Sequence, residues 1–276
     1  MLALVAGAPE ARALTATPLR LDPLNAGTGA TLLVGVDGTS LTSGAATPSS
    51  IVIALPRGTR LDTRASGRLC SRGQLARGSC PEASKVGFGR MTQAVSGFLR
   101  PGGETEVAWS IGVYLGVPSR PADAASVLLR AELLGAARAD ALLGPVLGTG
   151  LPHVSLVTGS LARPAAGPYG LELGLAGLPG DLRVPAPATA VPTRFEFAIG
   201  AVRRVREEFT RHVRVRTLGG YTTRRIRDHR LVGHDLLRNP RTCRTSWPGE
   251  VRIGFPSGVR RVATRIGCTD NAQLPT

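Results

Sequence analysis

Short alternating runs of apolar and polar residues dominate the N-terminal part of the chain. In each run about every second residue is apolar, and each run ends at a cluster of turn-forming residues. A period of two is typical of half-buried β-strands. The pattern predicts three strands, Leu14 to Leu21, Thr31 to Val36 and Ser50 to Leu55, which stop at Asp22-Pro23, Asp37-Gly38 and Pro56-Arg57-Gly58.

The same pattern continues towards the C-terminus. It predicts further strands at Val86 to Leu99, Glu106 to Val117, Val154 to Leu161, Tyr169 to Leu175, Phe195 to Ile199 and Val213 to Thr217, the last followed by a Gly219-Gly220 turn. Two final runs, Val251 to Phe255 and Val259 to Ile266, flank Pro256-Ser257-Gly258 and predict a closing hairpin. Short strands separated by turn residues favour an all-β fold of one or two antiparallel sandwiches, immunoglobulin-like in general architecture.

The segment from Asp123 to Leu143 is compatible with either a helix or a strand. Its Ala and Leu residues favour a helix, which Asp123 could cap. Within it, however, Arg130 and Glu132 alternate with Leu129, Ala131 and Leu133. We therefore favour a strand at Val127 to Leu133.

Proline and glycine clusters divide the chain. Pro101-Gly102-Gly103 marks the place where a domain boundary would fall, near Pro101 to Thr105. We expect an N-terminal β-sandwich region over residues 14–104 and a C-terminal β-rich region over residues 105–276, as two units or as one continuous domain. A loop rich in Pro and Gly is expected at Pro179 to Pro192.

The four cysteines form two close pairs along the chain, Cys70 with Cys80 and Cys243 with Cys268. Four cysteines allow three pairings, and the sequence alone does not choose among them; nearest-neighbour bridging would close one local loop in each half. A zinc site is disfavoured, because it normally uses cysteines two to four residues apart. Disulfides persist outside the reducing cytoplasm, so this interpretation favours export.

The N-terminus agrees with export. Residues 1–13 read as a truncated signal-peptide remnant, with a short apolar run followed by Ala11-x-Ala13, although the basic start of such a signal is missing. The apolar runs of the chain are far shorter than the ~20 residues that a membrane-spanning helix needs. We therefore expect a secreted or cell-envelope protein without a transmembrane segment.

The net charge of +15 first suggests a nucleic-acid partner. Only one of the 34 basic residues is a lysine, Lys85, and this bias indicates a GC-rich coding sequence rather than selection for binding. The charge is also uneven, because residues 194–276 carry 18 arginines and 7 acidic residues, a net charge of +11. An electrostatic function would therefore belong to the C-terminal third.

Within that third, five arginines are the candidate anion-binding residues: Arg214, Arg216, Arg224, Arg225 and Arg227. An arginine stripe suits bidentate contacts with phosphate, sulfate or carboxylate groups. Only Phe209 and Tyr221 interleave with the arginines, whereas nucleic-acid surfaces usually add stacking aromatic rings. The stripe is thus a solvated face or a surface for cell-wall or other polyanions, and nucleic acid is an unlikely partner.

Known catalytic patterns are missing from the sequence. It has no G-x-S-x-G, no H-E-x-x-H and no phosphate-binding loop, and Gly148-Thr149-Gly150 is not a dinucleotide motif. The nearest alternatives are the acidic pair Glu104 and Glu106 and the pair His229 and His234, each beside an aspartate. We expect solvated acids and polar loop histidines, with no catalytic residue, metal or cofactor.

Two passages around the cysteines contain distinctive motifs. The first contains Leu55-Pro56-Arg57-Gly58, then Cys70, then Cys80-Pro81-Glu82-Ala83-Ser84-Lys85-Val86-Gly87; the second contains Leu237-Arg238-Asn239-Pro240-Arg241-Thr242-Cys243 and Trp247. Both passages resemble a family of uncharacterised secreted proteins from high-GC soil actinobacteria. They cover less than a quarter of the chain. The resemblance implies a secreted all-β protein with two local disulfides and no established activity.

These observations together favour a secreted, non-enzymatic structural or binding protein, with an anionic cell-wall polymer or another envelope protein as its partner. The first alternative is a hydrolase of cell-wall polymer or polysaccharide, which would need a carboxylate pair or a His/Asp cluster in one cleft. The second alternative is a polyanion-binding module that uses the arginine-rich C-terminal third.

Overall fold

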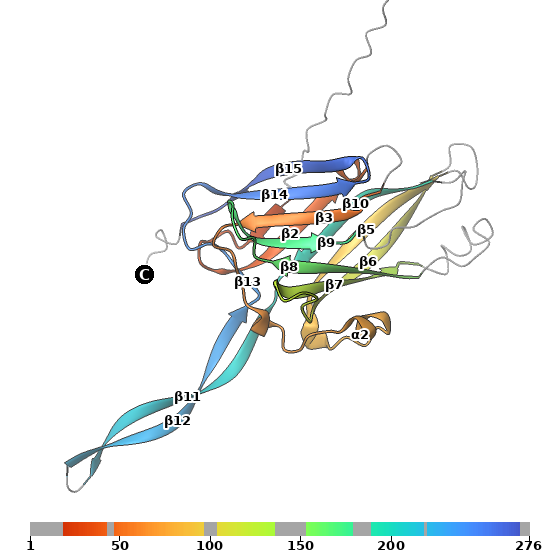
Figure 1. Cartoon of the computed structure of the whole chain (residues 1–276). Coiled ribbons are helices and arrows are strands. Elements are labelled where there is room, and N and C mark those ends of the chain that lie inside the picture. Colours follow the sequence, from red (N-terminus) through yellow and green to blue (C-terminus); the bar gives the residue numbers. More distant parts are fainter. Residues whose placement is uncertain are drawn as a thin grey trace, which may run out of the picture.

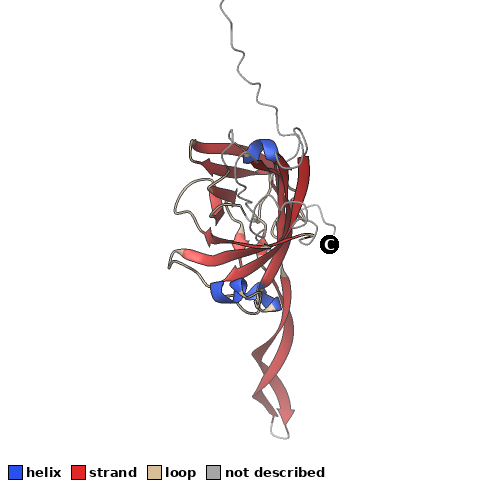
Figure 2. Cartoon of the chain, turned by 90° about the vertical axis from the view of Figure 1, so that its right-hand side faces the viewer, coloured by secondary structure: helices blue, strands red, loops and turns tan. Residues whose placement is uncertain are grey.

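The chain folds almost entirely into β-strands. The computed structural model describes residues 19–42, 47–96, 104–135, 153–178, 189–217 and 220–270. Within these ranges the helical elements are short: α1 (Gly38–Leu41), α2 (Arg72–Ala76) and the 3-10 helices η1 (Thr63–Ala65) and η2 (Glu82–Ser84) (Figure 2). The prediction of an all-β antiparallel fold is confirmed.

Thirteen strands form one antiparallel sheet. They follow the order β15-β14-β3-β9-β8-β7-β6-β5-β10-β2-β13-β4, and β1 pairs with β2. Their bounds are β1 (Leu19–Asp22), β2 (Gly29–Asp37), β3 (Ser50–Pro56), β4 (Arg60–Leu61), β5 (Lys85–Ser96), β6 (Glu104–Gly116), β7 (Asp123–Leu133), β8 (Val154–Ala162), β9 (Tyr169–Leu175), β10 (Thr189–Ile199), β13 (Leu237–Arg238), β14 (Ser246–Phe255) and β15 (Gly258–Gly267). Strands from both sides of the expected boundary near Thr105 alternate along this path.

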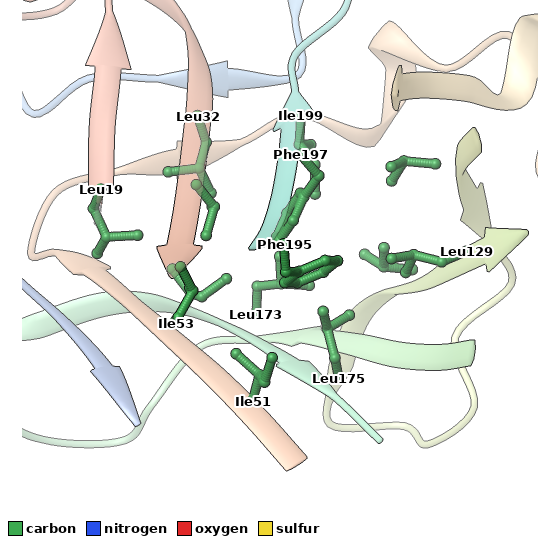
Figure 3. Close-up of a cluster of buried hydrophobic side chains, with 14 of the residues drawn as sticks. Leu19, Leu32, Ile51, Ile53, Leu129, Leu173, Leu175, Phe195, Phe197 and Ile199 are labelled. Atoms are coloured by element: carbon green, nitrogen blue, oxygen red, sulfur yellow. The ribbon is translucent and has the colours of Figure 1, made fainter. Parts of the chain in front are cut away.

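The sheet curls into two layers around one core. In Figure 1 the layer that contains β3, β9 and β8 lies over the layer that contains β2, β10 and β5. Phe195, Phe197 and Ile199 of β10 are buried and face Ile53 and Leu173 of the other layer (Figure 3). The two layers belong to one continuous order of hydrogen-bonded strands. The predicted immunoglobulin-like architecture is therefore not confirmed.

The two ends of the curled sheet meet at β1 and β14. The two strands pack closely at Gly249 in β14. If this glycine carried a Cβ atom, that atom would lie only 3.2 Å from Leu19 Cδ1 in β1. Nearby, Asn25 and Thr269 form a parallel bridge, and the Ala26 amide donates to the Thr269 carbonyl at 2.9 Å. These contacts enclose the core on the side opposite to the β6–β7 pairing.

Most predicted strands are found, with the expected faces inward. The segment that was compatible with a helix forms β7, in which Arg130 and Glu132 point away from the core formed by Leu129, Ala131 and Leu133. The C-terminal hairpin β14–β15 has the predicted turn. The end of the expected loop at Pro179 to Pro192 is different, because Thr189–Pro192 belong to β10. Residues 1–18, 97–103, 136–152 and 179–188 lie outside the described ranges, and with them the signal-peptide prediction.

Both disulfides join nearest neighbours along the chain. Cys70 pairs with Cys80 and Cys243 with Cys268, with Cα–Cα distances of 5.2 and 6.0 Å. The first loop contains α2, which covers the outer side of β7 through a small buried cluster of Cys70, Leu75 and Leu128. The second disulfide joins the outer ends of the β14–β15 hairpin, as predicted.

We call the thirteen-stranded sheet with its short helices the body. Two long strands leave it. β11 (Val202–Thr217) and β12 (Gly220–Asp235) pair only with each other and project as a twisted hairpin (Figure 1). Sixteen residues per strand correspond to a length of about 50 Å. We call this hairpin the arm. The sequence predicted the strand at Val213 to Thr217 but not the length of the arm, and Gly219 of the predicted turn lies outside the described residues.

The two disulfides should contribute unequally to stability. The Cys243–Cys268 loop spans 25 residues and the Cys70–Cys80 loop spans 10. The chain-entropy model therefore gives about 3.5 kcal/mol for the longer loop and about 2.7 kcal/mol for the shorter loop. Denaturant unfolding of the two Cys→Ala double variants should show a lower free energy of unfolding for both, with the greater loss for Cys243→Ala/Cys268→Ala. A greater loss for the other pair would contradict this order.

Candidate functional site

The register of the arm sorts the five candidate arginines between its two faces. Arg214 pairs with Thr223, and Arg224 with Val213. Because side chains alternate along each strand, Arg214, Arg225 and Arg227 lie on one face and Arg224 lies on the other. Arg216 pairs with Tyr221 next to the turn, where only the backbone is described. Three of the five candidate arginines therefore share one face, and Arg224 does not belong to it.

Local contacts hold some of these arginines and leave others open. Arg227 Nε lies 3.4 Å from Glu208 Oε1, and the guanidinium of Arg214 lies 5.2 Å from the centre of the Tyr221 ring. Arg224 and Arg225 form no ion pair with any residue whose side chain is described. All of these side chains except Arg216, which is not described, are exposed. The arm carries ten arginines and four acidic residues, a net charge of +6.

The second face of the arm is partly apolar. Phe209, Val213 and Val215 are half-buried there, and Ile226 is 37% exposed. The same face holds the ion pair between Arg211 Nε and Asp228 Oδ2 at 3.1 Å. Cross-strand contacts of this kind stabilise a hairpin that has no third strand. The arm therefore combines a cationic face with a face that supports its own fold.

A polar cleft of about 660 Å³ lies at the base of the arm, where β12 returns to the body. We call it the basal cleft. Three segments line it: residues 58–64, the pair Arg163 and Gly170, and residues 232–238. Four arginines belong to its wall: Arg60, Arg64, Arg163 and Arg238. The cleft therefore brings together basic residues that are far apart in the sequence.

Asp62 organises one side of the basal cleft. Its carboxylate accepts hydrogen bonds from Arg64 Nε and Nη2, both at 2.9 Å, and lies 2.9 Å from Nδ1 of the buried His234. The Arg64 hydrogen bonds, helped by that of His234, hold the pKa of the Asp62 carboxyl well below its ordinary value, against the opposing effect of burial. Asp62 is therefore ionised at neutral pH.

Asp235 forms the second acidic position of the basal cleft. Arg238 Nη2 donates to Asp235 Oδ2 at 3.1 Å. Gly29 of β2 makes room for this carboxylate, since any side chain at that position would collide with it. Sequence reasoning did not identify Asp62 as a site residue, because its partner His234 lies 172 residues away in the chain, and it considered Asp235 only as the aspartate beside His234.

The histidine pair considered from sequence is not brought together in one site. His229 and His234 are five residues apart on β12, an odd separation that puts them on opposite faces of the arm. Only His234 lines the basal cleft. Glu106 lies elsewhere, in a hollow between Arg90 and Arg194 on the body, and the side chain of Glu104 is outside the description. Among the described residues no group of three or more His, Cys, Asp or Glu could hold a metal ion.

Comparison with known proteins gives no relative. No protein-family model, curated protein or solved structure matches the chain. Within the described ranges, none of the helices has the length and apolar character needed to cross a membrane. The interpretation of function therefore depends on the arm and the basal cleft.

Replacement of Asp62 by Asn should destabilise the protein by about 1 kcal/mol at pH 7, since it weakens the hydrogen bonds to Arg64 and His234 at a half-exposed site. The ionised carboxylate contributes its full stability at pH values above 3.8, which is the ordinary pKa of the carboxyl group in the unfolded chain. That contribution is lost as the pH falls below 3.8 towards the lowered pKa of the folded state.

Thermal unfolding of wild type and Asp62→Asn across pH 2.5 to 7 measures this effect. The difference in melting temperature should not shrink between pH 7 and pH 5, and should shrink below pH 3.8. Asp270→Asn, at an exposed position, is the matched control and should match wild type throughout. A difference between Asp62→Asn and wild type that already closes at pH 5 would contradict the assignment.

Proposed function

We propose that the protein is an exported, non-enzymatic binding protein whose arm binds an extended anionic polymer, such as an anionic polymer of the cell wall. The observation that carries this proposal is the arm itself: ten arginines concentrated on a two-stranded hairpin that projects from the body. A projecting cationic surface can lie along a polymer without hindrance from the rest of the molecule. Its charge also attracts such a partner from a distance.

The spacing of the cationic face suits a linear partner. Residues two apart on a strand recur about every 6.7 Å on the same face, so Arg225 and Arg227 would contact neighbouring charges of an extended chain. On the adjacent strand, Arg214 and His212 continue the same face. Guanidinium groups form bidentate hydrogen bonds with phosphate, sulfate and carboxylate groups.

Export is supported by the two disulfides, which persist in an oxidising compartment. The described residues contain no free cysteine. An exported arm would meet cell-wall polymers more readily than nucleic acid. Tyr221 is the one exposed aromatic side chain described on the arm, and the guanidinium of Arg214 already covers it. A surface for stacked bases has less support for this reason.

A hydrolase is the less supported alternative. The basal cleft does contain two carboxylates, Asp62 and Asp235. A glycosidase needs one carboxyl group that keeps its proton as a general acid. Here Arg64 lowers the pKa of Asp62, and Arg238 pairs with Asp235. Asp62 therefore does not keep a proton to donate, and the carboxylate of Asp235 already accepts a hydrogen bond from Arg238, so a binding role has more support.

Substitution on the cationic face tests the proposal. Arg214→Gln/Arg225→Gln should weaken binding to heparin and to teichoic acid. The slope of log binding constant against log salt concentration should also become less steep by about two, one for each arginine removed. Arg241→Gln/Arg265→Gln, which removes two exposed arginines of the body, is the charge-matched control and should behave nearly as wild type. Affinities and their salt slopes come from titrations over a series of salt concentrations.

Equal losses in the two double variants would show that net charge, not the arm, governs binding, and would overturn the proposal. Binding to vesicles of phosphatidylglycerol without binding to either polymer would overturn it as well, because the partner would then be a membrane. Circular dichroism of the variants checks that the all-β fold is retained.

A further inference from the structure

The basal cleft is distinct from the cationic face of the arm and has its own charge balance. Its lining includes four arginines and two aspartates, which give a net charge of +2 with His234 neutral. The arginines come from three separate segments, and Arg60 is the cross-strand neighbour of Arg238. A small anion in the cleft would therefore lie among guanidinium groups that are far apart in the sequence.

Two of the four arginines are already paired within the protein. Arg64 pairs with Asp62, and Arg238 pairs with Asp235. Arg60 and Arg163 are exposed and form no ion pair with any residue whose side chain is described. These two guanidinium groups are therefore available to an anion, while the paired arginines hold the two aspartates in place.

Thr59 gives an independent indication of a ligand. The residue belongs to the lining of the basal cleft and is only 7% exposed. Its Oγ1 atom is buried and has no hydrogen-bond partner among the described residues. A buried polar atom without a partner is costly, and most such atoms in folded proteins are satisfied. A ligand oxygen in the cleft would satisfy this hydroxyl once the Thr59 side chain turns towards it.

We propose that the basal cleft binds a phosphate dianion, either free or as a monoester on a small polar molecule. Two negative charges neutralise the net charge of the lining. A tetrahedral group offers oxygens in several directions, which suits the two open arginines and the hydroxyl of Thr59 better than a planar carboxylate does. The volume of about 660 Å³ leaves room for the remainder of a monoester.

This site does not depend on the function proposed for the arm. The residues that would hold the phosphate are Thr59, Arg60 and Arg163 in the body, and none of them belongs to β11 or β12. Binding in the cleft and binding along the arm can therefore be abolished separately. Either proposal can fail while the other stands.

Calorimetric titration with inorganic phosphate at pH 7.5 tests the site. Wild type should bind one phosphate per chain, and Arg60→Gln/Arg163→Gln should bind at least tenfold more weakly. Arg241→Gln/Arg265→Gln is the charge-matched control, and Arg214→Gln/Arg225→Gln is the control on the arm; both should retain the wild-type affinity. Equal weakening in all three double variants, or no saturable binding by wild type, would overturn the proposal.

A second variant separates ligand binding from structural support. Thr59→Val keeps the shape of the side chain but removes the unpartnered hydroxyl. It should lower phosphate affinity severalfold without lowering the melting temperature of the ligand-free protein. Loss of stability together with unchanged affinity would show that the hydroxyl serves the fold and would contradict its assigned role.

Glycerol 3-phosphate distinguishes the two sources of phosphate. Tighter binding of glycerol 3-phosphate than of inorganic phosphate would support the site and identify a monoester as its ligand. Tighter binding of inorganic phosphate would support the site and identify the free anion. Sensitivity of both ligands to Arg60→Gln/Arg163→Gln is required, and binding that does not respond to this substitution would contradict the location.

Discussion

A single constraint governs this fold: most strands of the body have one apolar face, and these faces must share one interior. β2 shows it most simply, because its buried residues alternate regularly with half-buried ones. A sheet with one apolar face can hide that face by curling until its own strands cover it. The contacts between β1 and β14 then complete the enclosure, and the Cys243–Cys268 disulfide holds the neighbouring hairpin.

The same constraint explains why the arm leaves the body. In β10 the buried residues Phe195, Phe197 and Ile199 occupy alternate positions of one face. Beyond Ala201 charged residues occupy both faces, as Arg211 and Arg214 do on β11. Neither face could enter the core without burying unpaired charge, which is strongly unfavourable. The chain therefore forms a hairpin in solvent, and the element most suited to binding is the one that the core cannot accept.

Local patterns made much of the fold predictable from the sequence. Alternation located β3, β9 and the closing hairpin closely, and it correctly favoured a strand at β7, where Arg130 and Glu132 point outward. Turn residues marked where most strands end. Of the three pairings open to the four cysteines, the structure has the one between nearest neighbours, which closes one local loop in each half. All of these signals are short-range, which is why they could be interpreted without knowledge of the topology.

The candidate site was less predictable because it depends on long-range contacts. The arginines of the arm were visible as a cluster in the sequence, but their division between two faces depends on the register of β11 and β12. The basal cleft had no local signal at all, since curling of the sheet is what brings Arg163 near Arg60 and Asp62 near His234.

Asp62 also connects the basal cleft with the arm. Its amide donates to the carbonyl of Leu236 at 2.9 Å, just after β12, while its carboxylate binds His234 within β12. The amide of Leu236 in turn donates to the carbonyl of Ala201 at 2.8 Å and closes the base of the hairpin. The wall of the cleft is therefore the attachment point of the arm. A ligand held there would contact the same segment that fixes the direction in which the cationic face projects.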